Sequence, residues 1–373
     1  MKKVVFLLSH IPNPRMLKRI KAIESDFRIT VLYWDRGQEI KETFEINPNH
    51  SVKKILLKAP MGQPIKRIIP WIRFFIKSFR ILKKEIPAII HVSNLDMLLI
   101  ACFYKITRKK TANIIYEVAD LPKHWTVNKI RSVRDFMMFM LKKIEMKSMS
   151  RVSKLILTSP YFWDVYYSKF TNEEKYMFMP NAPYRSIFKE YNKKSHDKFT
   201  VGFIGSVRFV EQLKMLIEAV EEIDEDIDIF IAGGGPSYHE IKKIAQNKKF
   251  VKLYGPYNYE KEIVELYENV DCVYSVYNTK TEGVKVALPN RLYEAIVCSL
   301  PIIASKNTVL GDFIEENDIG FVVNDKSELK ASLMELKNNK NTLKRIEENC
   351  NNIKENYYFE NSSRYLLKEY LNL

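Results

Sequence analysis

Glycine and cysteine are scarce in this sequence. Its 373 residues include 11 glycines, 15 prolines and four cysteines, and 46% are hydrophobic. This composition excludes collagen-like and disordered chains. The cysteines show no CxxC or histidine-flanked spacing, which argues against structural zinc and for a reducing compartment. We expect all four thiols to be buried, namely Cys102, Cys272, Cys298 and Cys350.

Long apolar runs are also missing. The N-terminal run Val4–Leu8 has five residues, and Met97–Tyr104 has eight between two charged residues. A membrane-spanning helix needs about 18 apolar residues, and the core of a signal peptide is longer than Val4–Leu8. We therefore expect a cytoplasmic protein that is soluble or binds a membrane only peripherally.

Acidic residues are few in the first half of the chain. The net charge is +15, and residues 1–190 hold 36 Lys and Arg against 16 Asp and Glu, whereas residues 191–373 hold 24 against 29. Such asymmetry indicates that one half meets an anionic surface, either a nucleic acid or an acidic membrane.

Residues 51–84 contain ten basic residues and no acidic one. Within them, residues 63–84 combine a basic helical stripe with isoleucines and phenylalanines, as in helices that lie on anionic membranes. An ordinary surface helix of an α/β domain has the same two-sided pattern and remains an alternative. Nucleic acid is not expected, because no helix-turn-helix, zinc finger or RNA-binding motif accompanies the stripe. The stripe consists of Arg73, Lys77, Arg80 and Lys84.

Short β-branched runs alternate with helical segments along the whole sequence, which predicts parallel sheets flanked by helices. A polar stretch at residues 184–198 interrupts the alternation and reads as a linker. We therefore predict an α/β protein of two doubly wound domains, residues 1–187 and 188–354, with a C-terminal helix at about 355–373 that packs back on the first. Predicted strands begin at residues 4, 29, 89, 113, 154 and 177, and then at 200, 228, 251, 272, 301 and 320.

Glycines follow three predicted strands of the second half. Gly205 ends one strand just before a helix, where it lets a diphosphate approach the helix N-terminus, and Arg208 adds a cation. A plain tight turn is the alternative. Gly233–Gly235 end the next strand and serve either a close strand-to-helix crossover or a ligand. No GxGxxG follows the first strand of the chain, so a dinucleotide fingerprint is missing.

The segment 271–305 is the richest in candidate residues. A strand leads into a polar loop, and then Pro289 and Asn290 open a helix that carries Arg291 and Glu294 on one face. A surface ion pair is the plain interpretation of this spacing. A carboxylate at the carboxyl edge of a parallel sheet can instead accept hydrogen bonds from two ribose hydroxyls. Tyr257, after the third glycine-ended strand, is close enough in sequence to border a nucleobase.

Together these segments resemble the family 4 retaining glycosyltransferases of GT-B fold, in particular bacterial members that build capsules and other surface polysaccharides. The resemblance is carried by the two α/β halves, Gly205, IAGGGP at 231–236 and above all ALPNRLYEAIVCSLPIIAS at 287–305. It implies two Rossmann-like domains, an N-terminal acceptor-binding domain and a C-terminal nucleotide-sugar-binding domain. It implies no metal, and no DxD motif follows a predicted strand.

The resemblance assigns roles to residues of the second half. Glu294 matches the glutamate that holds the donor ribose, and Gly205 and Arg208 lie in the loop that meets the donor diphosphate. Three motif positions depart from the family, with Val286, Glu211 and Ala119 in place of a glutamate, a lysine and a histidine. We expect the donor contacts to be completed by a wider set, namely Lys214, Gly234, Tyr257, Lys285, Asn290 and Arg291.

For the first half, the resemblance implies an acceptor site with Glu117, Asp120 and Asn94, each just after a predicted strand. Asp120, Glu117 and Lys285 are the catalytic candidates, although Glu117 can equally be a buried structural group. The expected reaction is sugar transfer from a nucleoside diphosphate sugar to a lipid-linked saccharide at the inner face of the plasma membrane. A catalytically weakened partner subunit and a dinucleotide enzyme are the alternatives.

Overall fold

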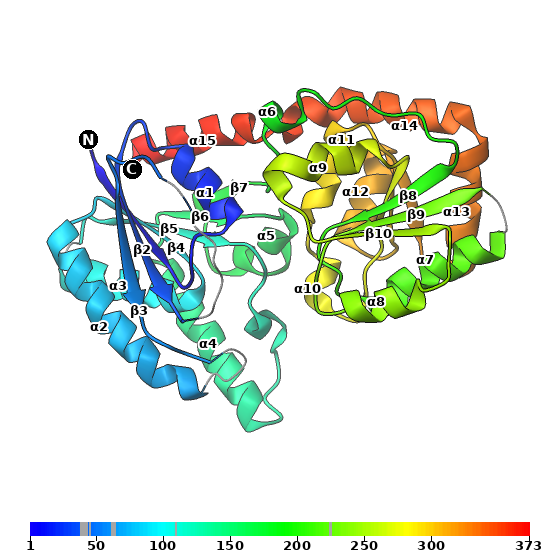
Figure 1. Cartoon of the computed structure of the whole chain (residues 1–373). Helices are drawn as coiled ribbons and strands as arrows, with labels where there is room; N and C mark the ends of the chain where they lie inside the picture. Colours follow the sequence, from blue (N-terminus) through cyan, green and yellow to red (C-terminus); the bar gives the residue numbers. More distant parts are fainter. Residues whose placement is uncertain (38–43, 45, 61–64, 109, 224–225) are drawn as a thin grey trace. The chain divides into compact units, whose positions relative to one another are not determined.

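The computed structural model describes residues 1–37, 44, 46–60, 65–108, 110–223 and 226–373. It divides into unit 1, residues 1–179 with 362–373, and unit 2, residues 180–361 (Figure 1). The boundary therefore lies at residues 179 and 180, eight residues before the one expected from the polar stretch. No helix in the described part of the chain is both long and apolar enough to cross a membrane.

Unit 1 is a seven-stranded parallel sheet in the order β3-β2-β1-β4-β5-β6-β7. Its central strands form because apolar, β-branched runs can be buried on both faces of a parallel sheet. The elements are β1 (Lys3–Leu8), α1 (Pro14–Lys21), β2 (Arg28–Asp35), β3 (Ser51–Leu56), η1 (Ile65–Arg67), α2 (Ile68–Glu85), β4 (Ile89–Ser93), α3 (Leu95–Thr107), β5 (Asn113–Val118), η2 (Lys123–Thr126), α4 (Val133–Met149), β6 (Lys154–Leu157), α5 (Tyr161–Val165), η3 (Tyr167–Lys169), η4 (Glu173–Lys175) and β7 (Tyr176–Phe178).

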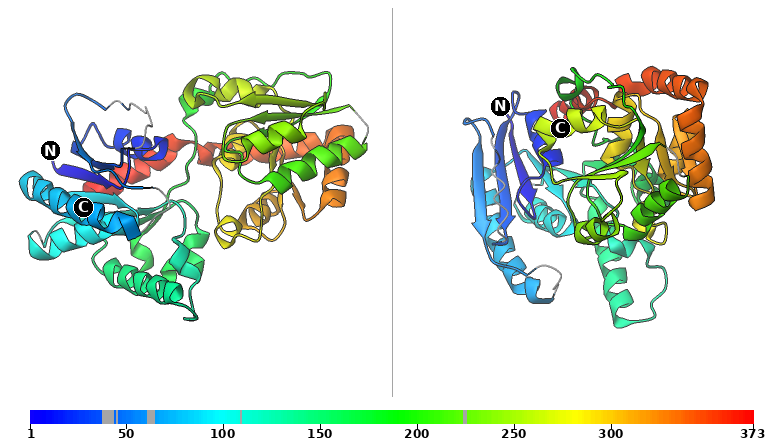
Figure 2. Two further views of the ribbon diagram at one scale, coloured as in Figure 1. Left: turned by 60° about the horizontal axis from the view of Figure 1, so that its bottom comes forward. Right: turned by 45° about the vertical axis from the view of Figure 1, so that its right-hand side comes forward.

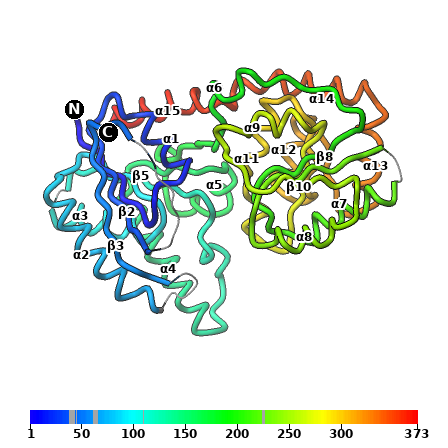
Figure 3. Tube along the Cα trace, in the orientation of Figure 1, coloured from blue at the N-terminus to red at the C-terminus, as the bar shows by residue number. Residues whose placement is uncertain are grey.

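Helices cover both faces of this sheet (Figure 2). α2, α3 and α4 lie side by side on one face. On the other face α1 packs with the end of α15 (Phe359–Asn372), whose Leu366 and Tyr370 are completely buried in the core of unit 1. Lys154 pairs with Glu369 at 2.6 Å and fixes the helix further. The C-terminal helix thus returns to unit 1, and the trace in Figure 3 shows it beside α1.

Unit 2 is a six-stranded parallel sheet in the order β10-β9-β8-β11-β12-β13, with one continuous core. The two sheets with their helices confirm the predicted doubly wound α/β class. The elements are α6 (Arg185–Phe188), β8 (Phe199–Ile204), α7 (Val210–Ile223), β9 (Ile227–Ala232), α8 (Tyr238–Ile244), β10 (Val251–Gly255), α9 (Tyr259–Glu268), β11 (Cys272–Ser275), α10 (Glu282–Lys285), α11 (Asn290–Val297), β12 (Ile302–Ser305), α12 (Val309–Asn317), β13 (Gly320–Val323), α13 (Lys326–Asn338), α14 (Lys340–Ile353) and η5 (Lys354–Tyr357).

The order of the strands determines where each unit has a crevice. The strand order reverses between β1 and β4 in unit 1 and between β8 and β11 in unit 2. In doubly wound sheets, ligands bind at the carboxyl ends of the strands at such a reversal. In unit 1, Asn94 spans the reversal, because its amide donates to the Ser9 hydroxyl at 2.7 Å.

Candidate functional site

Two glycine loops of unit 2 lie against each other beyond the ends of β8 and β9. Val207 N–H donates to the Gly234 carbonyl at 2.9 Å, which continues the pairing of the strands. A Cβ on Gly233 would lie 1.9 Å from the Gly205 oxygen, and one on Gly235 would lie 2.4 Å from the Val207 oxygen. Gly233 and Gly235 are therefore required by the close approach of the two loops.

Arg291 lies at the strand reversal of unit 2. Its Nη1 donates to the Tyr274 carbonyl at 3.2 Å, and its guanidinium carbon is 4.0 Å from the ring centroid of Phe203. The Tyr277 ring lies on it as well, at 5.4 Å. A Cβ on Gly205 would come within 2.6 Å of Nη2. Glycine at 205 therefore leaves the space in which this buried cation is held.

Glu294, one turn further along α11, is also buried. Tyr259 donates to Oε1 at 2.7 Å and Tyr267 to Oε2 at 2.8 Å, both from α9. Burial and the nearby carboxylate raise the pKa of both phenols and raise the pKa of Tyr257 to about 12, so the three tyrosines stay protonated. The surface ion pair with Arg291 is therefore wrong: each side chain is buried and has its own partners.

Two of the cations expected at the donor site, Arg208 and Lys214, are exposed. Arg208 donates from Nε to the Ser206 hydroxyl at 3.1 Å, and its carbonyl accepts from the Ser237 hydroxyl at 3.0 Å. Lys214 lies in the second turn of α7 and pairs with Glu218 at 3.8 Å, one turn further from the helix start. Arg208 is thus in the loop itself, whereas the Lys214 ammonium is directed away from it.

The loop between β11 and α11 contains the other assigned residues. Lys285 pairs with Glu282 at 2.7 Å within the short helix α10. Asn290 begins α11 and accepts a hydrogen bond from the amide of Asn181 at 2.8 Å. Val286 is buried, so an apolar side chain packs where the family has a glutamate.

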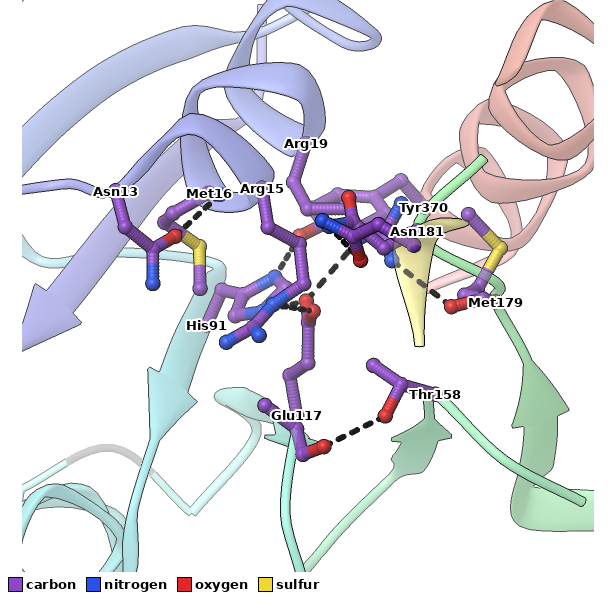
Figure 4. A network of polar contacts seen from close by, with 12 residues as sticks. Asn13, Arg15, Met16, Arg19, His91, Glu117, Thr158, Met179, Asn181 and Tyr370 are labelled. Atoms are coloured by element: carbon purple, nitrogen blue, oxygen red, sulfur yellow. Dashed lines mark hydrogen bonds and ion pairs between the residues drawn. The ribbon is translucent and has the colours of Figure 1, made fainter. Parts of the chain in front are cut away.

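Glu117 of unit 1 is completely enclosed (Figure 4). Its carboxylate lies 2.9 Å from Arg15 Nε, 3.3 Å from Arg19 Nε and 3.2 Å from His91 Nε2. Burial alone would raise its pKa, but Arg19, His91 and Arg15 outweigh that effect and hold the pKa well below its usual range. The other imidazole nitrogen bonds to the hydroxyl of Tyr370 on α15. This geometry supports the structural alternative for Glu117.

Asp120 lies in the loop that follows β5, where it is exposed. The loop is held from its other side, because Thr158 donates to the Ala119 carbonyl at 2.7 Å. Asp120 is therefore the accessible one of the two acidic candidates in unit 1.

Sequence reasoning missed a second buried carboxylate, Glu145 of α4. It accepts hydrogen bonds from three phenols and bonds to the imidazole of His124 at 2.7 Å. These contacts fix η2, just beyond the Asp120 loop. An acidic residue alone among basic and apolar ones was the available signal, but its partners come from three separate stretches of the chain, which are β5, η2 and residues 166–167. The phenols are Tyr116, Tyr166 and Tyr167.

Within the described ranges, no group of three or more His, Cys, Asp or Glu side chains comes together that could hold a metal ion. Near the glycine loops, positive charge comes from Arg208, Arg291 and the N-terminus of α7. The first turn of α7 carries Glu211, an anion where the family has a cation.

Comparisons with known proteins agree with this architecture. Residues 185–353 match the family model of the glycosyl transferases group 1. The chain is 24% identical over 251 residues to the succinoglycan biosynthesis protein ExoL of Rhizobium meliloti (strain 1021), covering 64% of this chain and 60% of that protein. It is 25% identical over 198 residues to the processive diacylglycerol beta-glucosyltransferase of Bacillus subtilis (strain 168), covering 52% of this chain and 48% of that protein.

Solved structures are similar over the whole chain. HepE of Anabaena in complex with UDP superposes with a TM-score of 0.70 at 14% identity, over 100% of this chain and 99% of that one. The sucrose-phosphate synthase of Thermosynechococcus elongatus gives a TM-score of 0.73 at 13% identity, over 100% and 99%. The chain therefore has the GT-B fold, and its residues 185–353 match the glycosyl transferases of group 1.

Proposed function

We propose that the protein is a retaining hexosyltransferase that moves a sugar from a nucleoside diphosphate sugar to a hydroxyl of a lipid-linked saccharide. The product would be a bacterial surface polysaccharide such as a capsule. The observation that carries this proposal is the buried Glu294 carboxylate, one helical turn from the buried Arg291 cation, at the carboxyl edge of unit 2. HepE has been solved with UDP and with UDP-glucose, so uridine nucleotides are the first donors to test.

In this mechanism Glu294 holds the donor ribose. Each carboxylate oxygen accepts a hydrogen bond from one phenol and keeps a second lone pair for a ribose hydroxyl. Tyr259 and Tyr267 fix the orientation of the carboxylate before the donor arrives, so little entropy is lost on binding. The buried tyrosines also keep water away and strengthen the bonds to the ribose.

The departing diphosphate develops negative charge, which the protein must stabilise. Arg291 and Arg208 are the two arginines near the glycine loops, and N–H groups at the start of α7 add a positive dipole end. Gly205 lets the diphosphate approach the backbone. We assign Lys285 to the side of the site that receives the donor sugar. If its ion pair with Glu282 is broken, the ammonium becomes free to contact the donor.

The acceptor is assigned to unit 1. Asp120 is exposed at the carboxyl edge of that sheet and is suited to steer an acceptor hydroxyl, whereas Glu117 is enclosed by two arginines and a histidine. The proposal therefore retains Asp120 as the catalytic candidate of unit 1 and assigns Glu117 to the structure.

Peripheral binding to the inner face of the plasma membrane completes the proposal. The predicted segment 63–84 is described from Ile65 onward. In α2 only Phe74, Ser78 and Leu82 are buried, while Ile69 is 64% exposed beside the basic stripe. α4, on the same face of unit 1, also exposes a row of apolar side chains. That row consists of Val133, Phe136, Met137 and Met140.

A catalytically weakened partner subunit is the second candidate. It is favoured by Val286, which replaces a glutamate, and by Glu211, which replaces a lysine at the start of α7. Such a protein would bind a nucleotide sugar weakly or not at all.

The deciding experiment is donor cleavage. The purified protein is incubated with UDP-, GDP- and ADP-sugars and free nucleotide is measured. We expect one donor to be bound and cleaved, and Glu294→Gln to abolish both. Glu315→Gln, an exposed carboxylate on α12 of the same unit, is the matched control and should behave as wild type. If no donor is bound or cleaved and Glu294→Ala leaves polysaccharide synthesis intact, the enzyme assignment is wrong.

A further inference from the structure

Three buried N–H donors lie together at the carboxyl edge of unit 1. They are Nε of Arg36, Nε of Arg67 and the indole Nε1 of Trp71, and none has a hydrogen-bond partner among the described residues. A buried donor without an acceptor costs about 1–3 kcal/mol, so three in one region are unusual. Arg36 directly follows β2, and Arg67 is the residue before α2 begins.

Ring stacking brings these donors to one place. Phe74 of α2 stacks on Trp34 of β2 with centroids 5.2 Å apart and planes 15° apart. The Arg36 guanidinium lies over the same Trp34 ring at 4.9 Å. Arg67, Trp71 and Phe74 are spaced by four and three residues and thus share one face of the helix. The face of α2 that packs on Trp34 therefore extends beyond the end of β2, where Arg36 lies.

The charges of this cluster are unbalanced. Burial and the charge of Arg67 both lower the pKa of Arg36. Asp96, in the first turn of α3, is the acidic group near them among the described residues; its pKa is raised because burial outweighs the opposite effect of Arg36 and Arg67. Within that part of the chain, two cations against one carboxyl leave a net positive charge at the N-terminus of an 18-residue helix, whose dipole adds to it.

We propose that Arg36, Arg67 and Trp71 bind a phosphate group of the acceptor, as a phosphomonoester or diphosphate. Two arginines and an indole N–H supply the forked and single donors that phosphate oxygens accept, and the anion would relieve the repulsion between the guanidiniums. This inference rests on the proposed function, in which unit 1 receives the acceptor. It adds the chemical class that the acceptor carries beside its sugar.

Inorganic pyrophosphate is the probe, measured by calorimetry on the full chain. Arg67→Gln and Trp71→Phe should each weaken its binding, Arg67→Gln by at least about tenfold because a charge-assisted bond is lost. Arg28→Gln is the matched control, since Arg28 is an exposed arginine at the start of β2, the opposite end of that strand from Arg36, and it should leave the affinity within about twofold. An equal loss in the Arg28 variant, or no loss in the Arg67 variant, would overturn the site.

The thermal midpoint separates a binding role from a structural one. If Arg67 serves a ligand, Arg67→Gln removes a like charge and a donor that has no partner in the described part of the chain, so the midpoint without pyrophosphate should stay level or rise. The increase that pyrophosphate gives to wild type should disappear. A lower midpoint together with unchanged pyrophosphate binding would assign Arg67 to the structure and refute the proposal.

Two further measurements define the source of the phosphate and keep this proposal apart from the donor chemistry. Vesicles with phosphatidic acid, a phosphomonoester, are compared with phosphatidylglycerol vesicles of equal charge. Preference for phosphatidic acid that Arg67→Gln removes supports a lipid phosphate, and pyrophosphate binding without that preference supports a soluble one. Hydrolysis of UDP-, GDP- and ADP-sugars is followed in the same variants. Lost pyrophosphate binding with intact hydrolysis affects this site alone, whereas absent hydrolysis in wild type contradicts only the proposed function.

Discussion

Replacing Gly205 with alanine tests whether the glycine holds space for Arg291. The φ of Gly205 is 138°, where a side chain costs about 1–3 kcal/mol in backbone strain. The new Cβ would also lie 2.6 Å from Arg291 Nη2, so the guanidinium must move. Moving it breaks the bond to the Tyr274 carbonyl and the contact with Phe203, which together are worth about 1–3 kcal/mol.

The expected total is a loss of about 2–6 kcal/mol in the stability of unit 2. Affinity for the donor nucleotide should fall by at least about tenfold, since a displaced cation no longer meets the diphosphate. Gly283→Ala is the matched control, because a Cβ there meets nothing within 4 Å. All four tryptophans lie in unit 1, so fluorescence follows that unit in a urea titration and circular dichroism follows both.

A double-mutant cycle separates the clash from the backbone strain. In an Arg291→Ala background the obstacle is gone, so Gly205→Ala should cost only the strain. The two substitutions should then couple by about 1 kcal/mol or more. Strictly additive costs would refute the account of Gly205 as space for the guanidinium, and wild-type nucleotide affinity in Gly205→Ala would remove Arg291 from the donor site.

Three other predictions concern separate regions. Tyr267→Phe removes one of the two phenols that donate to Glu294, so it should lower the free energy of unfolding by about 1–3 kcal/mol and weaken nucleotide binding. Unchanged nucleotide affinity would exclude this phenol from the site. Because folding lowers the pKa of Glu117, its contribution to the free energy of unfolding should be complete above about pH 4.5 and should decline as the pH falls below that value. Glu117→Gln should flatten the dependence of the unfolding free energy on pH in this range, and an unchanged dependence would contradict the role of this carboxylate. Reversing Arg73, Lys77 and Arg80 to Glu should reduce flotation with anionic liposomes by at least about a hundredfold, and binding that persists in the variant and at high salt would refute an electrostatic contact.

The strands that could be predicted are those whose both faces are buried. β1, β4 and β11 are apolar runs, and their observed bounds lie within a residue or so of the predicted ones. β3 was missed because it is an edge strand with lysines at 53 and 54, half-buried and exposed respectively, a pattern that blunts a sheet edge and carries little hydrophobic signal. The register of a strand pair depends on tertiary packing, which lies outside what a short window of sequence contains.

The position of the candidate site could be predicted from the sequence, but the residues that hydrogen-bond to Arg291 and Glu294 could not. The spacing of Arg291 and Glu294 on one helix was visible, and a surface ion pair was a reasonable alternative. What excludes that alternative is burial by Tyr259 and Tyr267, which lie 35 and 27 residues earlier on α9. Partners that come from another element have no local pattern.

The charge asymmetry follows the structural boundary. Unit 1, counted as residues 1–179 and 362–373, again holds 36 basic against 16 acidic residues, so the net charge of +20 belongs to one folded unit. Two sets of basic residues in this unit differ in exposure. Those on α2 are exposed, whereas Arg36 and Arg67 bury donor atoms at the sheet edge. Salt screens exposed charges more strongly than buried ones, so raising the ionic strength should release vesicles held by α2 before it releases pyrophosphate from Arg36 and Arg67.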